Sequence, residues 1–329
     1  MKDFEYAAPR EEADVVALLS PDWGHSEVLA GGTDLIGLMK KMIVTPRRVV
    51  NIKEVPSLHG IQRTSAGVTI GATTRLDEVL DSSDLDDFPA VKQAIRGIAS
   101  LQLQQQGTLG GELCQRPRCW YFRGGHGLLG DRGRLAANGE NRYHAILGNA
   151  GPAKFVSPSR VAPALIALGA QVRFIGPGPE DESLIPLEAF YRTPREEQQR
   201  ENILLPNQLL THIHLPLADG WLNATYEVRH GEGPDYPLAS AAAALKITGG
   251  VVADATIVMG HVAPTPWLSR EAAGTIIGQG VNRESAAAAG DAAVAQATPL
   301  SGNEYKVQLA RVAVKRAILA AAGLQTGGF

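Results

Sequence analysis

The sequence has little cysteine, little net charge and no long apolar run. Its two cysteines, Cys114 and Cys119, are too few for a disulfide framework and suit a reducing compartment. A formal net charge of -3 over 329 residues predicts no nucleic-acid partner. No stretch approaches the roughly 18 apolar residues of a membrane span, and residues 1–6 lack the apolar core of a secretory signal. We therefore expect a cytoplasmic protein with no membrane association.

The apolar content that is present, 44% of the residues, is enough for two or three packed units of roughly 100 to 200 residues each. Residues 28–35, Val-Leu-Ala-Gly-Gly-Thr-Asp-Leu, join a strand pattern to a helix start. Glycine permits a positive φ and close approach of a ligand, and the first N–H groups of a helix have no partners. A phosphate group would suit this turn. The alternative is an ordinary strand-to-helix turn with Thr33 or Asp34 as its N-cap.

The first 55 residues predict a compact β-α-β-α-β unit with the Gly31-Gly32 turn at its centre. Farther along, residues 58–61 and 67–72 predict an antiparallel pair, and Thr74 is the expected cap of the next helix. We expect helices at 89–100 and 161–168 and strands at 171–175 and 209–215.

A second glycine cluster, Gly107-Thr-Leu-Gly-Gly111, is expected in an irregular connection. Two glycine turns in one domain could grip opposite sides of an extended cofactor. The alternative is that these glycines mark bulges or turns in a β-rich subdomain. The loop-rich stretch from Glu112 to Pro158 follows, and its length indicates a purpose beyond connection.

A boundary is expected near residues 216–222, where the pattern is interrupted by Leu-Pro-Leu-Ala-Asp-Gly-Trp. The rest of the chain is rich in alanine. It predicts helices at 237–246, 267–277, 285–296 and 304–322 and one strand at 251–259. We see no nucleophile with a base in this part, so it is interpreted as a packing or docking domain.

Several motifs occur in an order that resembles one known family: 29–35, Ile-Gly-Ala-Thr-Thr at 70–74, 107–111, Pro-Ser-Arg with its alanine-leucine helix at 158–170, and Tyr-Glu-Val-Arg at 226–229. They resemble the FAD-binding subunit of the molybdenum hydroxylases, which include xanthine, aldehyde and carbon monoxide dehydrogenases. The run from Gln115 to Arg123 looks closest to the branch of aldehyde oxidoreductases and 4-hydroxybenzoyl-CoA reductase.

The resemblance implies an α+β fold. A two-part FAD-binding domain of the vanillyl-alcohol-oxidase (PCMH) type would cover residues 1–217, in subdomains of about 1–55 and 56–217, and a flavoprotein C-terminal α/β domain would cover 218–329. It further implies that electrons pass from a large molybdenum subunit through a small [2Fe-2S] subunit to FAD in this chain. The cofactor-binding residues would be Leu29, Ala30, Gly31, Gly32, Thr33, Asp34, Leu35 and Ile36, with Thr108, Gly110 and Gly111 closing the other side.

The chain departs from the family in its cysteines. The cluster-bearing branch has four cysteines in this region for a [4Fe-4S] centre, whereas here Cys119 stands alone and residues 124–154 contain none. Because such a cluster needs about four thiolates, we predict that this chain binds none. Each cysteine is instead interpreted as a half-buried structural residue.

Three further departures lie at expected flavin contacts: Glu112 stands where the family has Asn, Arg160 where it has Asp, and Glu227 where it has Lys. A carboxylate near a pyrophosphate repels it unless the carboxylate is screened or turned away. Arg160 could compensate as a new phosphate or ribose partner. Glu112 and Arg160 therefore complete the set of candidate cofactor-binding residues, and either the FAD site is rewired or it is decaying.

Other candidates have simpler interpretations. His212 and His214 would share one face of a strand, but no third metal ligand is near in sequence, so no metal site is predicted. The charged run at 192–200 is interpreted as a solvated loop, with docking as the alternative. The triplet at 120–122 is expected to fill core, although it could also cover a ring system or a partner.

Three functions stay open. The first is an FAD-binding oxidoreductase subunit that passes electrons from a molybdenum hydroxylase to an external acceptor. The second is a stand-alone flavoenzyme that acts on a small molecule, and the third is a flavin-free scaffold paralogue. The sequence identifies no catalytic residue, substrate, terminal acceptor or oligomeric state.

Overall fold

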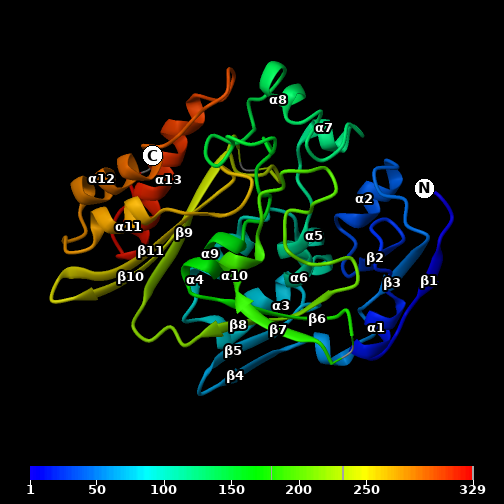
Figure 1. Cartoon of the computed structure of the whole chain (residues 1–329). Coiled ribbons are helices and arrows are strands. Elements are labelled where there is room, and N and C mark those ends of the chain that lie inside the picture. The colour runs from blue at the N-terminus through cyan, green and yellow to red at the C-terminus, as the bar shows by residue number, and fades with distance from the viewer. Residues whose placement is uncertain (179, 232, 328–329) are drawn as a thin grey trace.

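The computed structural model describes residues 1–178, 180–231 and 233–327, and these form three sheets with their covering helices (Figure 1). The first sheet is parallel, with strand order β1-β3-β2. The elements of this unit are β1 (Glu5–Ala7), α1 (Glu12–Leu18), β2 (Ser26–Leu29), α2 (Leu35–Lys40) and β3 (Arg48–Asn51). The sequence prediction of a β-α-β-α-β unit is therefore confirmed. Its core contains Val15 and Val16 of α1 packed with Val50 and Ile52.

The second sheet has the order β4-β5-β8-β6-β7, and all of its neighbouring strands are antiparallel. Its strands are β4 (Ile61–Thr64), β5 (Gly67–Gly71), β6 (Gln171–Ile175), β7 (Glu182–Pro186) and β8 (Leu209–Pro216). The helices and 3₁₀ turns of this region are η1 (Pro56–Leu58), α3 (Leu76–Asp81), η2 (Ser83–Leu85), α4 (Pro89–Arg96), α9 (Ala162–Ala167) and α10 (Leu187–Phe190).

The expected hairpin forms, but its first strand is β4 at Ile61–Thr64 rather than 58–61, and the expected cap of α3 is wrong. Arg75 occupies the N-cap position, and the hydroxyl of Thr74 instead exchanges hydrogen bonds with the backbone of Gly60. Thr74 therefore ties the hairpin to the start of α3 rather than capping that helix.

Four short helices lie between α4 and α9: α5 (Leu101–Gln106), α6 (Leu109–Cys114), α7 (Trp120–Arg123) and α8 (Arg134–Asn138). In the second glycine cluster, Gly107 is the C-cap of α5, Thr108 is the N-cap of α6 and residues 109–111 form the first turn of α6. The expected irregular connection and the alternative of bulges or turns in a β-rich subdomain are therefore both wrong, because the cluster joins two helices. The hydroxyl of Thr108 accepts a hydrogen bond from the N–H of Gly111 at 3.2 Å, which is the geometry of a helix N-cap.

The third sheet has the order β12-β11-β10-β9 and is antiparallel. Its elements are β9 (Leu222–Val228), β10 (Ala239–Thr248), β11 (Val251–Gly260), β12 (Trp267–Leu268), α11 (Arg270–Ile276), α12 (Arg283–Val294) and α13 (Tyr305–Ala321). The expected strand at 251–259 and the last two helices are confirmed. The helix expected at 237–246 is wrong because this segment is β10, and the helix expected from residue 267 begins only at Arg270.

The position of β10 explains this error. Ala242 and Ala244 on one face pack into the core of the second sheet, whereas Ala241, Ala243 and Leu245 on the other face pack into the core under α13. A strand with both faces buried loses the alternation that identifies strands, and alanine favours helix. Small side chains allow α9 and α13 to approach the two faces, and β10 therefore joins the two cores.

No helix in the described part of the chain is long and apolar enough to cross a membrane.

Candidate functional site

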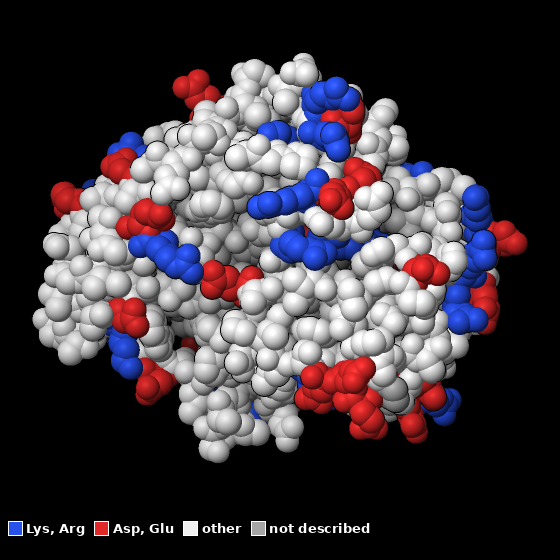
Figure 2. All heavy atoms as spheres, viewed as in Figure 1, with Lys and Arg blue, Asp and Glu red and all other residues white. Residues whose placement is uncertain are grey.

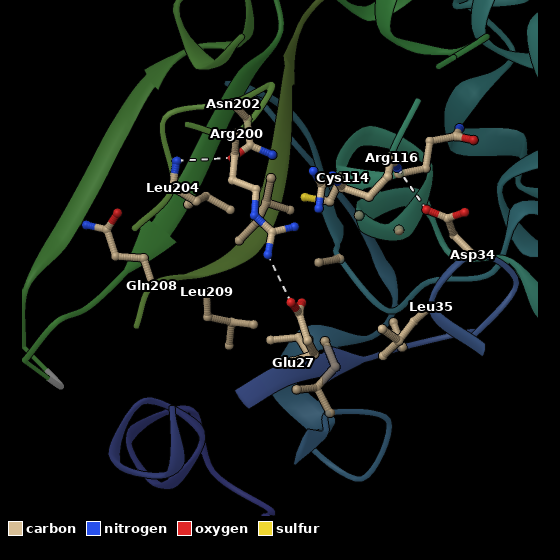
Figure 3. Close-up of a pocket in the computed structure, with 18 of the residues that line it drawn as sticks. Glu27, Asp34, Leu35, Cys114, Arg116, Arg200, Asn202, Leu204, Gln208 and Leu209 are labelled. Carbon is tan, nitrogen blue, oxygen red and sulfur yellow. Dashed lines mark hydrogen bonds and ion pairs between the residues drawn. The ribbon is translucent and has the colours of Figure 1, made fainter. Parts of the chain in front are cut away.

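The two glycine clusters lie on one cavity of about 210 Å³ between the N-terminal unit and the second sheet (Figure 3). The backbone segment from Ala30 to Leu35 lines it on one side, and Thr108, Gly110 and Gly111 line it on another. The sequence thus identified both walls. A cavity of this size is smaller than most small-molecule sites, so it suits part of an elongated ligand.

Residues of the first glycine motif that line this cavity have unpaired backbone donors. Among the described residues, the N–H groups of residues 31–35 find no hydrogen-bond acceptor. They lie where β2 has ended and α2 begins, so they include the unpaired donors that every helix start offers. Five neighbouring backbone donors on a cavity wall are suited to a polyanionic group such as a diphosphate.

Gly31 also makes the contact that holds the two motifs together. A Cβ atom at this position would lie 2.0 Å from the carbonyl oxygen of Gln106, immediately before the second glycine cluster. In return, the side-chain amide of Gln106 donates to the carbonyl oxygen of Gly31 at 3.1 Å. The first motif therefore requires glycine here because another part of the backbone occupies the space of a side chain.

The second glycine motif lines the cavity with glycine backbone that carries no side chain, and several of its N–H groups are already paired. The N–H groups of Leu109 and Gly110 donate to the carbonyl oxygens of Thr74 and Ala72 at 2.9 Å. A Cβ atom on Gly110 would lie 2.7 Å from that of Ala72, so Gly110 allows α6 to pack on the sheet. Gly111 is exposed and lines the cavity, and therefore lets a ligand approach the backbone of α6 closely.

Asp34 stands at the N-cap position of α2, but its side chain makes no capping hydrogen bond. One oxygen lies 2.7 Å from Nη2 of Arg123 and 3.1 Å from Nη1 of Arg118, and the other accepts from the N–H of Arg116 at 2.8 Å. Asp34 thus fixes the loop after α6 against the first glycine motif. Two guanidinium groups share one carboxylate, which leaves positive charge beside the free donors.

The far wall contains residues that sequence reasoning missed. Arg200 reaches across the cavity to Glu27 at 2.9 Å (Figure 3), and its guanidinium lies 4.2 Å from the centre of the Trp23 ring. Arg116 pairs with Glu201 at 2.9 Å. The interpretation of residues 192–200 as a solvated loop is therefore wrong for Arg200, which is half-buried. The mixed charges of residues 192–200 gave no sign that the Arg200 side chain turns toward the cavity.

Leu29, Ile36, Glu112 and Arg160 do not line this cavity. Glu112 points away from it, because its carboxylate accepts hydrogen bonds from the N–H of Arg160 at 2.7 Å and from the side-chain amide of Gln115. Its carboxyl lies inside the protein, and burial raises the pKa of Glu112 to about 7 despite the hydrogen bonds from Arg160 that lower it. The turned-away arrangement of Glu112 considered from the sequence is the one observed.

Arg160 and Glu227, the two reversals of charge, face each other. Nη1 of Arg160 lies 3.4 Å from a carboxylate oxygen of Glu227, and its other terminal nitrogen donates to the carbonyl oxygen of Asp235. Both side chains of the pair are buried. Burial raises the pKa of Glu227, whereas Arg160 and Arg229 lower it. The three departures at Glu112, Arg160 and Glu227 therefore form one internally paired cluster.

A second cavity, of about 260 Å³, adjoins the segment that follows α6. Its lining includes Arg118, Trp120, Tyr143 and Tyr236. Gln115 connects the two cavities. It lines the first, and its side-chain oxygen accepts from the hydroxyl of Tyr236 and from Arg118, both at 3.0 Å. The ring of Tyr236 also lies against the guanidinium groups of Arg118 and Arg160.

Neither cysteine is arranged as a reactive thiolate. Cys114 lines the first cavity, and burial raises its pKa to about 12. Sγ of Cys119 lies 3.2 Å from Nε2 of His144, but burial raises the pKa of Cys119 and lowers that of His144 to about 4, so both are neutral near pH 7. Both cysteines are half-buried, as expected.

No group of three or more potential metal ligands was found in the part of the chain that is described. His212 and His214 do share a face of β8, with ring centres 6.2 Å apart. In the triplet after Cys119, only Phe122 is buried in a core, whereas Trp120 and Tyr121 are half-buried.

Two family models match most of the chain. Residues 2–218 match the family described as the FAD binding domain in molybdopterin dehydrogenase, and residues 224–321 match the CO dehydrogenase flavoprotein C-terminal domain. The aldehyde oxidoreductase FAD-binding subunit PaoB of Escherichia coli strain K12 is 32% identical over 317 residues, which cover 94% of this chain and 96% of PaoB.

The carbon monoxide dehydrogenase medium chain of Hydrogenophaga pseudoflava is 27% identical over 330 residues, covering 97% of this chain and 96% of the relative. A solved structure of carbon monoxide dehydrogenase from the same organism superposes with a TM-score of 0.77 at 25% identity, covering 98% of both chains.

Proposed function

Because this chain belongs to the FAD-binding subunits of the molybdopterin dehydrogenases, a family of oxidoreductases, we propose that it binds FAD between its two glycine clusters and passes electrons to an external acceptor. The observation that carries this proposal is the set of unpaired backbone donors at residues 31–35, opposite the bare backbone of Gly111. Such a pair of walls suits the diphosphate of a dinucleotide.

The charges around the cavity support an anionic ligand. Arg116 and Arg200 line it, and Arg118 and Arg123 pair with its lining residue Asp34. These four guanidinium groups stand against three carboxylates, those of Glu27, Asp34 and Glu201. The carboxylate of Glu112, directly after the second glycine cluster, is turned away and accepts a hydrogen bond from the N–H of Arg160. The change from Asn to Glu therefore adds no carboxylate to the proposed diphosphate site, which favours a rewired site over a decaying one.

FAD supplies the redox chemistry when bound, so the share of this chain is to bind, orient and shield it. In the proposal, residues 30–35, Thr108, Gly110 and Gly111 hold the diphosphate, and Leu29 and Ile36 support the turn from behind. Glu112 and Arg160 act indirectly, through Gln115 and Tyr236, on the space between the two cavities. The aromatic side chains of the second cavity suit the flavin ring system.

The electron source that we propose is a large molybdenum subunit acting through a small [2Fe-2S] subunit. Two carbon monoxide dehydrogenase relatives, from Hydrogenophaga pseudoflava and Afipia carboxidovorans, are each named as a medium chain, which describes one subunit of a larger assembly. We propose no [4Fe-4S] cluster in this chain, because a cluster needs about four thiolates and the sequence has two cysteines whose pKa values are raised by burial.

The first experiment is the visible absorption spectrum of the purified chain, with the released cofactor identified after heat denaturation. It is followed by Gly111→Asp and Gly111→Asn, two variants of nearly equal size that differ in charge. The third residue of a helix accepts either side chain, and the Cβ atom that both variants share would lie 2.9 Å from the Thr108 hydroxyl, so any disturbance of that cap is the same in both. We expect bound FAD in the wild type and a greater loss of FAD in the Asp variant than in the Asn variant.

Equal losses in the two variants would count against a diphosphate at Gly111, because the Cβ contact with the Thr108 hydroxyl is common to both and only the charge differs. A wild-type content of FAD in Gly111→Asp would refute the proposed position of the diphosphate. A colourless wild-type chain that takes up no added FAD would refute the function itself and favour the scaffold alternative.

A further inference from the structure

An open hollow of about 540 Å³ lies at the surface between α8, the segment 150–154 and the loop that contains Arg195. Four basic side chains line it, from Arg132, Arg134, Lys154 and Arg195, and none of its described lining residues is acidic. In the upper part of the molecule, where Figure 1 has α7 and α8, Figure 2 shows several Lys and Arg side chains with a few Asp or Glu side chains among them.

The charge of the surrounding segment is unlike that of the rest of the chain. Residues 116–154 contain seven Lys or Arg and two acidic residues, a net charge of +5, although the whole chain carries -3. Arg116, Arg118 and Arg123 are paired with carboxylates at the first cavity. Of the other cations in the segment, Arg132, Arg134 and Lys154 line the hollow, whereas Arg142 pairs with Glu140.

Three of the four cations in the hollow lack a carboxylate partner. Arg132, Lys154 and Arg195 form no ion pair with any described residue, whereas Arg134 pairs with Asp131 at 2.7 Å. Lys154 donates to the carbonyl oxygen of Asn149. Unpaired cations gathered in a concavity raise the local concentration of anions and stabilise them when bound.

The backbone of the hollow is specifically shaped. Residues 130–133 all have a positive φ, including the two non-glycine residues Asp131 and Arg132 at 55°. Such backbone conformations persist only where the surroundings hold them. A Cβ atom on Gly133 would lie 2.5 Å from the carbonyl oxygen of Pro152 and 3.2 Å from the side chain of Lys154. This turn therefore brings Arg132 and Arg134 to the same hollow as Lys154.

We propose that this hollow is a binding site for a phosphate-bearing small molecule of about the size of a nucleoside diphosphate. Arginine forms paired hydrogen bonds with phosphate oxygens, and the hollow has a volume in the range typical of small-molecule sites. Its concave shape favours a small ligand over the acidic surface of a protein. The site is separate from the glycine motifs, since none of its lining residues lines the first cavity.

The test is calorimetric titration of the flavin-loaded chain with inorganic pyrophosphate and with ADP, at 50 and 300 mM NaCl. The Debye length is about 14 Å at the lower salt concentration and about 6 Å at the higher one. The double variant Arg132→Asn, Arg195→Gln removes two unpaired cations, and asparagine tolerates the left-handed conformation at residue 132. We expect binding at low salt that is at least about tenfold weaker in the double variant, since each lost charged hydrogen bond is worth that much.

The matched control is Arg283→Gln, an exposed arginine at the start of α12 outside the hollow, which should bind as the wild type does. Tighter binding of ADP than of pyrophosphate would identify a nucleotide, and equal binding a simpler phosphate compound; either supports the proposal. Absence of binding at 50 mM NaCl, or equal affinity in the wild type and the double variant, would overturn it. Failure of the flavin proposal would appear separately, as a wild-type chain that is colourless and takes up no added FAD, a result that does not depend on the hollow variants.

Discussion

Replacement of Glu112 by glutamine should change how the stability of the protein depends on pH. Burial raises the pKa of Glu112 from 4.5 to about 7 in the folded protein. Between these values the unfolded chain releases the proton of this carboxyl before the folded chain does. The free energy of unfolding therefore falls as pH rises from 4.5 to 7, and the whole contribution is present only below 4.5.

The magnitude follows from the difference between the two pKa values. A shift from 4.5 to about 7 corresponds to at most about 3.5 kcal/mol, at about 1.4 kcal/mol for each unit of pKa. Glutamine has nearly the same shape and does not titrate. Relative to Glu112→Gln, the wild type should thus lose about 3 kcal/mol between pH 4 and 8, while other titrating groups contribute equally to both proteins.

The assay is chemical denaturation of the wild type and Glu112→Gln at intervals from pH 4 to 8. A constant offset between the two curves is expected, because glutamine cannot accept every hydrogen bond that Glu112 accepts from Arg160, Ser159 and Gln115. Only the change of the offset with pH carries the argument. Parallel curves across the whole range would refute the reasoning, as would a wild type that gains stability relative to the variant as pH rises.

Two other substitutions test the contacts that join the units. Gly31→Ala would set a methyl group 2.0 Å from the carbonyl oxygen of Gln106, so chemical denaturation should show a free energy of unfolding lower by about 1–3 kcal/mol, and the variant should lose flavin. The control is Gly37→Ala in α2, where the added methyl group meets nothing within 4 Å; it should be neutral or stabilising by up to about 1 kcal/mol. Lys306→Met removes the ammonium that donates to the carbonyl oxygens of residues 143, 144 and 261, and should cost about 2 kcal/mol or more in denaturant. Lys315→Met on the same helix should change stability by less than about 0.5 kcal/mol, and equal effects of the two lysine variants would contradict the role given to Lys306.

Local patterns sufficed for the N-terminal unit and for the first glycine motif. In residues 1–55, glycines, helix starts and alternating apolar residues lie within a few positions of one another, so the elements follow from neighbours in sequence. The same holds for β5 and α13, whereas β4 lies three residues later than the strand expected at 58–61. The ordered motifs also carried the resemblance to the flavoprotein family, which the comparisons confirm.

Tertiary structure decided what depends on distant partners. The alanine run of β10 is a strand because α9 and α13 cover its two faces, and no local signal outweighs the preference of alanine for helix. Gly31 meets Gln106, 75 positions away in sequence, and Arg200 turns inward because Glu27 lies opposite. Glu112, Arg160 and Glu227 appear in the sequence as three separate departures, and only folding, which removes them from water and brings them together, makes them one paired cluster.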